Sequence, residues 1–226
     1  MTLIALESAI TSYRFGPFLA EAQSSQAALD LYVWNEAVAA SLLPPLRAIE
    51  VAVRNAFNDC LKQLYSFYWY DDPAFLTMAA TRPLKHLAPD IARELSRLKP
   101  PPGATKVHPD SLTAALSFGF WTTLLDPTFE PVLWAPSLQH AFPHYRQRTN
   151  KIIIRPRVAQ RFQDIRKLRN QVSHNEHLLK RKNLVADYEN VLDTLEWITP
   201  GLSDWIEHHS SFRSVYDRRL RPRHVY

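Results

Sequence analysis

Glycine is scarce in this sequence: only four glycines occur among 226 residues, whereas proline occurs 17 times. Sheet proteins need glycine in tight turns and bulges, so its scarcity disfavours a β-rich fold. The prolines punctuate segments whose apolar residues recur with helical periodicity. We therefore expect an all-α protein in which residues 1–226 form a single helical domain with proline-rich loops.

Cysteine and long apolar runs are also lacking. The single Cys60 excludes an internal disulfide and a zinc site made of cysteines alone, and its apolar surroundings indicate a packed thiol. No apolar run approaches the roughly 20 residues that span a bilayer. Glu7 interrupts a short apolar N-terminus that has no basic segment, which is unlike a signal peptide. These features predict a cytoplasmic protein without a membrane partner.

Motifs for nucleotide hydrolysis and for metal binding are missing as well. The sequence contains no glycine-rich phosphate loop. Three pairs of histidines could each hold a metal in principle: His140 with His144, His174 with His177, and His208 with His209. None of these pairs has a third ligand at the spacing of a metal-binding motif. We expect no metal and no cofactor.

Positive charge is concentrated in one part of the chain. Residues 146–182 contain twelve basic and only two acidic side chains. Such a block favours a polyanionic partner, although a solvated helix face is the alternative. The candidate RNA-binding residues are Arg155, Arg157, Arg161, Lys180, Arg181 and Lys182. A second basic segment, about 210–226, is interpreted as a solvated tail.

The helices follow from apolar periodicity and from proline positions. Residues 65–110 form an excursion whose aromatic-rich start, 65–80, is expected to be core. In the segment Leu116–Trp121, Gly119 among large aromatics suggests a close approach of two helices. The expected helices are 3–24, broken near Gly16-Pro17; 26–43; 46–64, restarting after Pro44-Pro45; 83–98; 112–125, capped by Asp110 or Ser111; one from Pro156 through Val172; and 183–198.

Two polar stripes lie opposite the apolar faces of these helices. Arg47, Glu50 and Arg54 share one side of the helix 46–64. Glu50 could form ordinary surface ion pairs there, or it could orient an arginine toward a phosphate. The second stripe follows the helix that begins at Pro156 and consists of Arg166, Asn170, His174 and His177, with Arg169 and Ser173 at its edge.

The second stripe suits RNA cleavage by the ribose 2′-OH. Histidine ordinarily titrates near neutral pH and can move the proton. Arginine offers a permanent planar cation to phosphate oxygens, and asparagine can hold either group by hydrogen bonds. Arg169 and His174 alone are a weak pattern, however. A histidine that caps a helix and a solvated arginine would give the same spacing.

Three segments make the sequence resemble the Abi-like branch of the HEPN superfamily, which is associated with bacterial abortive infection. The similarity covers about residues 30–180, and the order and spacing of the segments match together. These segments are Tyr32-Val33-Trp34-Asn35 followed by Leu46–Asn55; Leu116-Ser117-Phe118-Gly119-Phe120-Trp121; and Ile165–Glu176, which contains Arg169-Asn170-Gln171-Val172-Ser173-His174.

The resemblance implies a HEPN-type helical bundle with additional helices and a metal-independent endoribonuclease with Arg169, Asn170 and His174 as catalytic residues. It also implies a homodimer with a composite active site, anti-phage or toxin-type defence, and control by a regulatory protein or a noncoding RNA. The supporting residues would be Arg47, Glu50, Arg54, Arg166, Ser173 and His177. Two alternatives stay open: a noncatalytic module that binds RNA, and a purely structural dimer in which the motif stabilises the interface.

Overall fold

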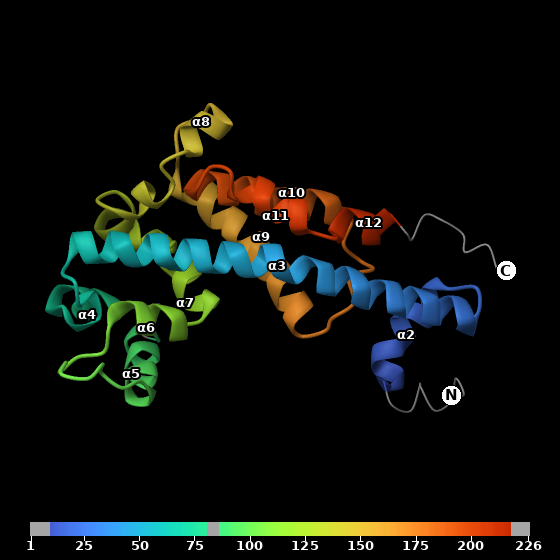
Figure 1. Ribbon diagram of the computed structural model, residues 1–226, viewed down its shortest axis with the longest axis horizontal. Helices are drawn as coiled ribbons and strands as arrows, with labels where there is room; N and C mark the ends of the chain where they lie inside the picture. The colour runs from blue at the N-terminus through green and yellow to red at the C-terminus, as the bar shows by residue number, and fades with distance from the viewer. Residues whose placement is uncertain (1–9, 81–85, 218–226) are drawn as a thin grey trace.

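The computed structural model describes residues 10–80 and 86–217. These residues form helices and no strand, which confirms the all-α prediction. Figure 1 shows the long helix α3 (Ser25–Leu64) running the length of the molecule, with α10 to α12 along one side, α4 to α6 on the other, and α9 crossing behind it. None of the described helices combines the length and apolar character needed to cross a membrane.

The remaining helices are mostly short. The segment 210–226 was predicted to be a solvated tail, but its first part forms helix α12, which buries Phe212. Residues 218–226 of this segment lie outside the described part. The elements besides α3 are α2 (Ser12–Glu21), η1 (Trp69–Asp71), α4 (Pro73–Ala79), α5 (Leu87–Arg97), α6 (Pro109–Ala115), α7 (Phe118–Thr123), η2 (Pro127–Phe129), η3 (Glu130–Trp134), η4 (Leu138–Ala141), α8 (Tyr145–Thr149), α9 (Arg155–Ser173), α10 (Leu184–Ile198), α11 (Leu202–His209) and α12 (Phe212–Asp217).

Helix α3 continues through Pro44-Pro45, so the predicted break between residues 43 and 46 is wrong. A proline inside a helix costs about 3 kcal/mol because it removes a hydrogen bond and crowds the preceding turn. Apolar side chains are buried on both sides of the prolines, Val38 and Leu42 before them and Leu46 and Ile49 after them. Each such burial contributes about 1.5–3 kcal/mol. Tertiary packing of both halves therefore keeps the helix continuous across the prolines.

The predicted break at Gly16-Pro17 is also wrong, because α2 contains Pro17 within its helical span. The predicted stretch 3–9 lies outside the described residues. Helix α2 packs across the first turns of α3 through a small separate cluster of Phe15, Phe18 and Ala28. This cluster places α2 beside the turn that follows α9.

The predicted helix 112–125 is divided in two. His108 caps α6, accepting from the N–H of Asp110 at 3.3 Å, and Ser117 caps α7, accepting from the N–H of Phe120 at 3.2 Å. Asp110 and Ser111, the two predicted caps, both lie inside α6. Asp110 accepts a hydrogen bond from Asn58 and pairs with Lys62 at 2.7 Å. A serine cap satisfies N–H groups that a continuing helix would bond internally, so it starts a new helix.

Most other helices agree with prediction. Helices α9 and α10 begin and end within a few residues of the expected positions, and the apolar positions of α9 are buried. The aromatic segment 65–80 contributes Trp69, Tyr70 and Phe75 to the main core. Helix α5 falls within the predicted 83–98, of which residues 81–85 lie outside the description.

Candidate functional site

Helix α9 ends in a turn that exposes His174. The N–H of Asn175 donates to the carbonyl of Val172 (3.3 Å), and the N–H of Glu176 donates to the carbonyl of Gln171 (2.9 Å). Asn175 adopts a φ of 53°. Together these features form a Schellman turn, the common way to end a helix with one left-handed residue. His174 is the C-cap and is exposed.

The turn removes His177 from the predicted stripe, because residues after Asn175 no longer follow the helix. The His177 ring instead packs edge-on against Phe18, with ring centroids 6.2 Å apart. Its Nδ1 is buried and has no hydrogen-bond partner in the described part of the chain. Arg166 and Asn170 lie on α9, and His174 caps its end.

Arg169 is held by Glu50 where α9 packs against α3. One carboxylate oxygen of Glu50 lies 3.4 Å from Nε of Arg169, and the other binds Arg54. Arg54 also donates to the carbonyl of Ala114 at 2.9 Å. The Glu50 side chain is only 13% exposed, whereas that of Arg169 is 34% exposed. Glu50 therefore orients Arg169 and leaves part of its guanidinium accessible to a ligand.

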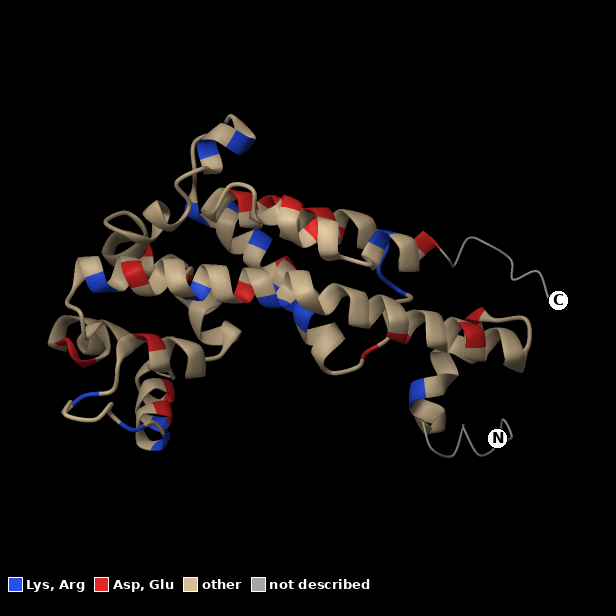
Figure 2. Ribbon diagram, viewed as in Figure 1, with Lys and Arg blue, Asp and Glu red and all other residues tan. Residues whose placement is uncertain are grey.

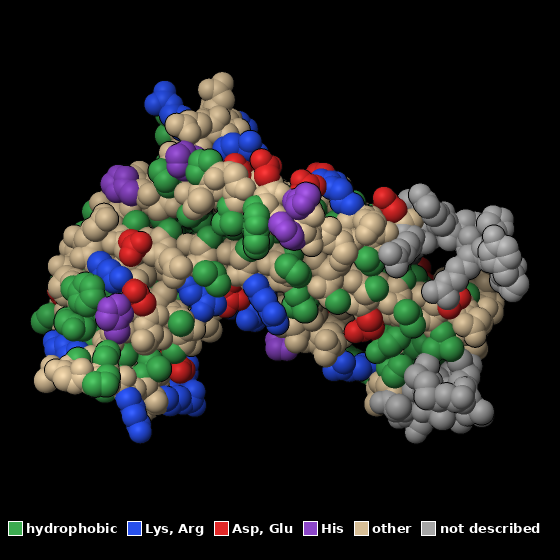
Figure 3. Space-filling model, in the orientation of Figure 1, with side chains coloured by type: hydrophobic (Ala, Val, Ile, Leu, Met, Phe, Trp, Pro, Cys, Tyr) green, Lys and Arg blue, Asp and Glu red, His purple; other side chains and the backbone are tan. Residues whose placement is uncertain are grey.

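Arg169 and His174 line two neighbouring cavities. The first, of about 370 Å³, contains Arg47, Glu50, Arg54, Arg169 and Ser173 among its walls. The second, of about 530 Å³, is lined by His174 and by residues of α2 and α3. Figure 3 shows blue and purple side chains gathered in the hollow beneath the middle of α3, between the lobe of α4 to α6 and that of α2. The motif thus borders two adjoining hollows of one surface.

Two predicted residues of the stripe have few polar contacts. Asn170 is half-buried, and among the described residues its side chain makes no hydrogen bond. Arg166 is exposed, reaches Thr122 at 3.5 Å and lies across Gly119 of α7. A Cβ built on Gly119 would lie 3.7 Å from this guanidinium, an ordinary contact. The helices α7 and α9 do approach here, but the contact does not require glycine.

Figure 2 marks the positions of the Lys and Arg residues on the ribbon. By exposure and contacts, the basic block divides into structural and exposed cations. Arg155 is 8% exposed, pairs with Glu130 at 2.8 Å and donates to the carbonyl of Leu125, so it is unavailable to RNA in this conformation. Arg181 pairs with Asp187 at 2.6 Å and is mostly buried. The exposed members of the predicted set are Arg157, Lys180 and Lys182.

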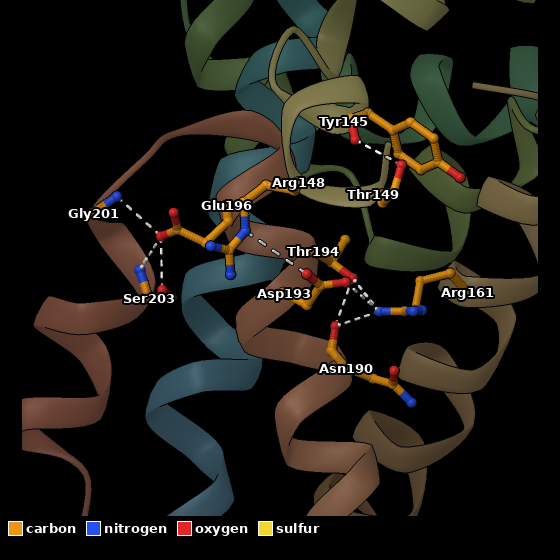
Figure 4. Close-up of polar contacts among 10 residues, drawn as sticks. All are labelled: Tyr145, Arg148, Thr149, Arg161, Asn190, Asp193, Thr194, Glu196, Gly201 and Ser203. Atoms are coloured by element: carbon orange, nitrogen blue, oxygen red, sulfur yellow. Dashed lines mark hydrogen bonds and ion pairs between the residues drawn. The ribbon is translucent and has the colours of Figure 1, made fainter. Parts of the chain in front are cut away.

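Arg161 is also part of the interior framework. It donates to the carbonyl of Asn190 at 3.0 Å and lies 3.3 Å from Asp193 (Figure 4). Its guanidinium also lies over the Trp197 ring, 4.9 Å from the ring centroid. Beside this group, Glu196 accepts hydrogen bonds from the hydroxyl and N–H of Ser203. These contacts tie α9, α10 and α11 together and support the helix that carries the motif.

Asn35 is a residue of this site whose role could not be seen in the sequence. It is 1% exposed, and its Oδ1 accepts from the N–H of Leu178 at 2.8 Å. Leu178 follows the Schellman turn, so this bond anchors the segment after His174 to α3. Asn35 lies in one of the segments that carry the resemblance. Its partner Leu178 is 143 positions further along the chain, so only the folded structure shows that the two residues meet.

Within the described ranges, no three histidine, cysteine or acidic side chains gather as a metal site would require. Cys60 is buried beside the carbonyl of Ser137, and burial raises the pKa of its thiol. A thiol of this kind is a poor nucleophile. The polar groups available at the hollow include the imidazole of His174, the amide of Asn170 and the guanidinium of Arg169, beside the exposed Arg47 and Ser173.

No family model, curated protein or solved structure matches this chain. The similarity to the HEPN superfamily therefore stays a prediction.

Proposed function

We propose that this protein is a HEPN-type, metal-independent endoribonuclease that cleaves RNA through the ribose 2′-OH. The observation that supports the proposal best is the end of α9. There the exposed His174 directly follows Ser173, which lines the cavity in which Glu50 holds a partly exposed Arg169. An arginine with a carboxylate partner is oriented before a phosphate arrives, which is what charge stabilisation in a transition state requires.

The proposed reaction uses the RNA's own nucleophile. The 2′-oxygen forms a bond to phosphorus and loses its proton to His174 acting as general base, while the bond from phosphorus to the 5′-oxygen breaks. Arg169 stabilises the charge on the phosphoryl oxygens, and Asn170 orients the groups. The products are a 2′,3′-cyclic phosphate and a 5′-hydroxyl, whose leaving oxygen takes a proton from a general acid.

A second copy of the chain would supply the missing general acid. The motif of one protomer contains a single histidine, His174, which cannot act as general base and general acid in the same step. We therefore include in the proposal a homodimer with a composite site. Such an enzyme would act in anti-phage or toxin-type defence in the cytoplasm and would need control by a partner protein or a noncoding RNA.

The test is incubation of the purified protein with mixed cellular RNA in EDTA. We expect cleavage that leaves cyclic-phosphate ends. His174→Ala and Arg169→Ala should each lower the rate at least about 100-fold, the usual contribution of one proton-transfer or charge-stabilising group. His208→Ala and Arg97→Ala are matched controls, because both residues are exposed and belong to other helices, α11 and α5. Equal rates for all variants would refute the assignment.

A noncatalytic RNA-binding module is the second candidate. It is favoured by the exposed cations Lys180 and Lys182, which make no ion pair within the described chain. RNA that stays intact but binds with strong salt dependence would support this function instead.

A further inference from the structure

Several aromatic rings line the cavity beside His174, although binding of a phosphate group requires none. It lies between α2, the first half of α3 and the turn after α9, and its volume is about 530 Å³. Tyr13, Phe18, Tyr32 and the His177 ring contribute to its walls. Phe18 and Tyr32 pack edge-on at 5.2 Å, which fixes the floor. Tyr13 is 90% exposed, the highest exposure among the large apolar side chains that are described.

The polar side chains of this cavity divide into acceptors and cations. Glu36 and Glu176 are the carboxylates among its walls, and Arg14 and Lys180 are the cations. Within the described chain, Arg14, Glu176 and Lys180 form no ion pair, so their charges are available to a ligand. The buried and unpartnered Nδ1 of His177 is a further polar group beside the cavity.

We propose that this cavity binds an unpaired nucleobase of the RNA strand, next to the phosphate at His174. The inference rests on the proposed action on RNA and adds a base-binding subsite to it. Unpaired bases bind proteins by stacking on aromatic rings, and they are read through hydrogen bonds to their Watson–Crick edges. Tyr13 is the stacking residue, while Arg14 and Lys180 contact the flanking phosphates.

The carboxylates predict which bases fit. Glu36 and Glu176 can only accept hydrogen bonds when ionised, so they favour bases that carry an exocyclic amino group. Adenine, cytosine and guanine have such a group, and uracil has none. The cavity volume falls in the range of small-ligand pockets and accommodates one base with its sugar.

The test measures binding with oligonucleotides that cannot be cleaved. The probes are fluorescein-labelled 2′-O-methyl oligoadenylate, oligouridylate and an abasic chain of the same length and charge. Of these probes, we expect the protein to bind oligoadenylate most tightly. Tyr13→Ala should weaken oligoadenylate binding about tenfold, a typical loss for one stacked base, and should leave binding of the abasic chain unchanged.

Two variants control for the ring and for surface aromatics in general. Tyr13→Phe keeps the ring and should bind like the wild type. Trp205→Ala removes another exposed aromatic, on α11, and should have no effect. If Tyr13→Ala binds oligoadenylate as tightly as the wild type, or weakens the abasic chain equally, the base-binding proposal is overturned while RNA binding stands. If the wild type binds none of the probes, the proposed function fails with it.

Discussion

Replacing Asn35 with leucine should destabilise the protein measurably. The side chain of Asn35 accepts the hydrogen bond of the buried Leu178 N–H, which has no other partner in the described part of the chain. Both Asn35 and Leu178 are 1% exposed, and the bond between them is 2.8 Å long. Leucine has the same number of side-chain heavy atoms and the same branching but no acceptor. A buried donor left without a partner costs about 1–3 kcal/mol. We expect a loss of about 2 kcal/mol in the free energy of unfolding, roughly 30-fold in the equilibrium constant.

Urea unfolding followed by circular dichroism measures this loss, and Asn55→Leu is the matched control. Asn55 lies on the same helix but is exposed, so its replacement should change stability by less than about 0.5 kcal/mol. Amide exchange adds a local readout, since the Leu178 N–H should lose protection beyond the global effect. Equal midpoints for Asn35→Leu and Asn55→Leu would refute the reasoning.

Two further predictions concern stability alone. Burial acts to raise the pKa of Glu196, but hydrogen bonds from Ser203 and Gly201 outweigh burial, so the pKa is lowered. The ionised Glu196 therefore stabilises the folded protein at neutral pH, and this stabilisation is lost as the pH falls below the ordinary carboxyl range. Glu196→Gln should therefore cost about 1 kcal/mol at pH 7 in urea unfolding, and the gap from wild type should close below about pH 4; a gap that persists there would contradict this. Gly119→Ala should increase the free energy of unfolding by about 0.5–1 kcal/mol, because the new Cβ meets only ordinary contacts and α7 gains helix propensity. The melting temperature should therefore rise slightly, and a lower melting temperature than that of the wild type would contradict this prediction.

Sequence patterns predicted the helices whose signals are local. The apolar steps from Val158 to Val172 run along one face of a helix in any environment, and Pro156 favours its first turn, so α9 was expected nearly as it is. Asn175, three positions after Val172, was also a readable stop signal, since asparagine tolerates the left-handed conformation of a helix end. That signal would have placed His177 beyond the helix.

Other features depended on contacts between distant segments. Pro44-Pro45 normally interrupts a helix, and only burial of both halves of α3 overrides that preference. Arg155 and Arg161 looked like members of a basic surface, yet acidic and carbonyl partners far along the chain draw them inside. Charge counts cannot distinguish these residues from Lys180 or Lys182, because burial depends on packing.

The sequence by itself determined the all-α class and the order of Arg169, Asn170 and His174 on one helix, since helical periodicity and the scarcity of glycine are local properties. The tertiary structure decided how those residues are used. Packing of α3 against α9 brings Glu50 to Arg169, 119 positions apart, and Asn35 to the turn that exposes His174. Docking of α2 adds an aromatic cavity beside that histidine. These arrangements arise from long-range burial and hydrogen bonding, which no local pattern encodes.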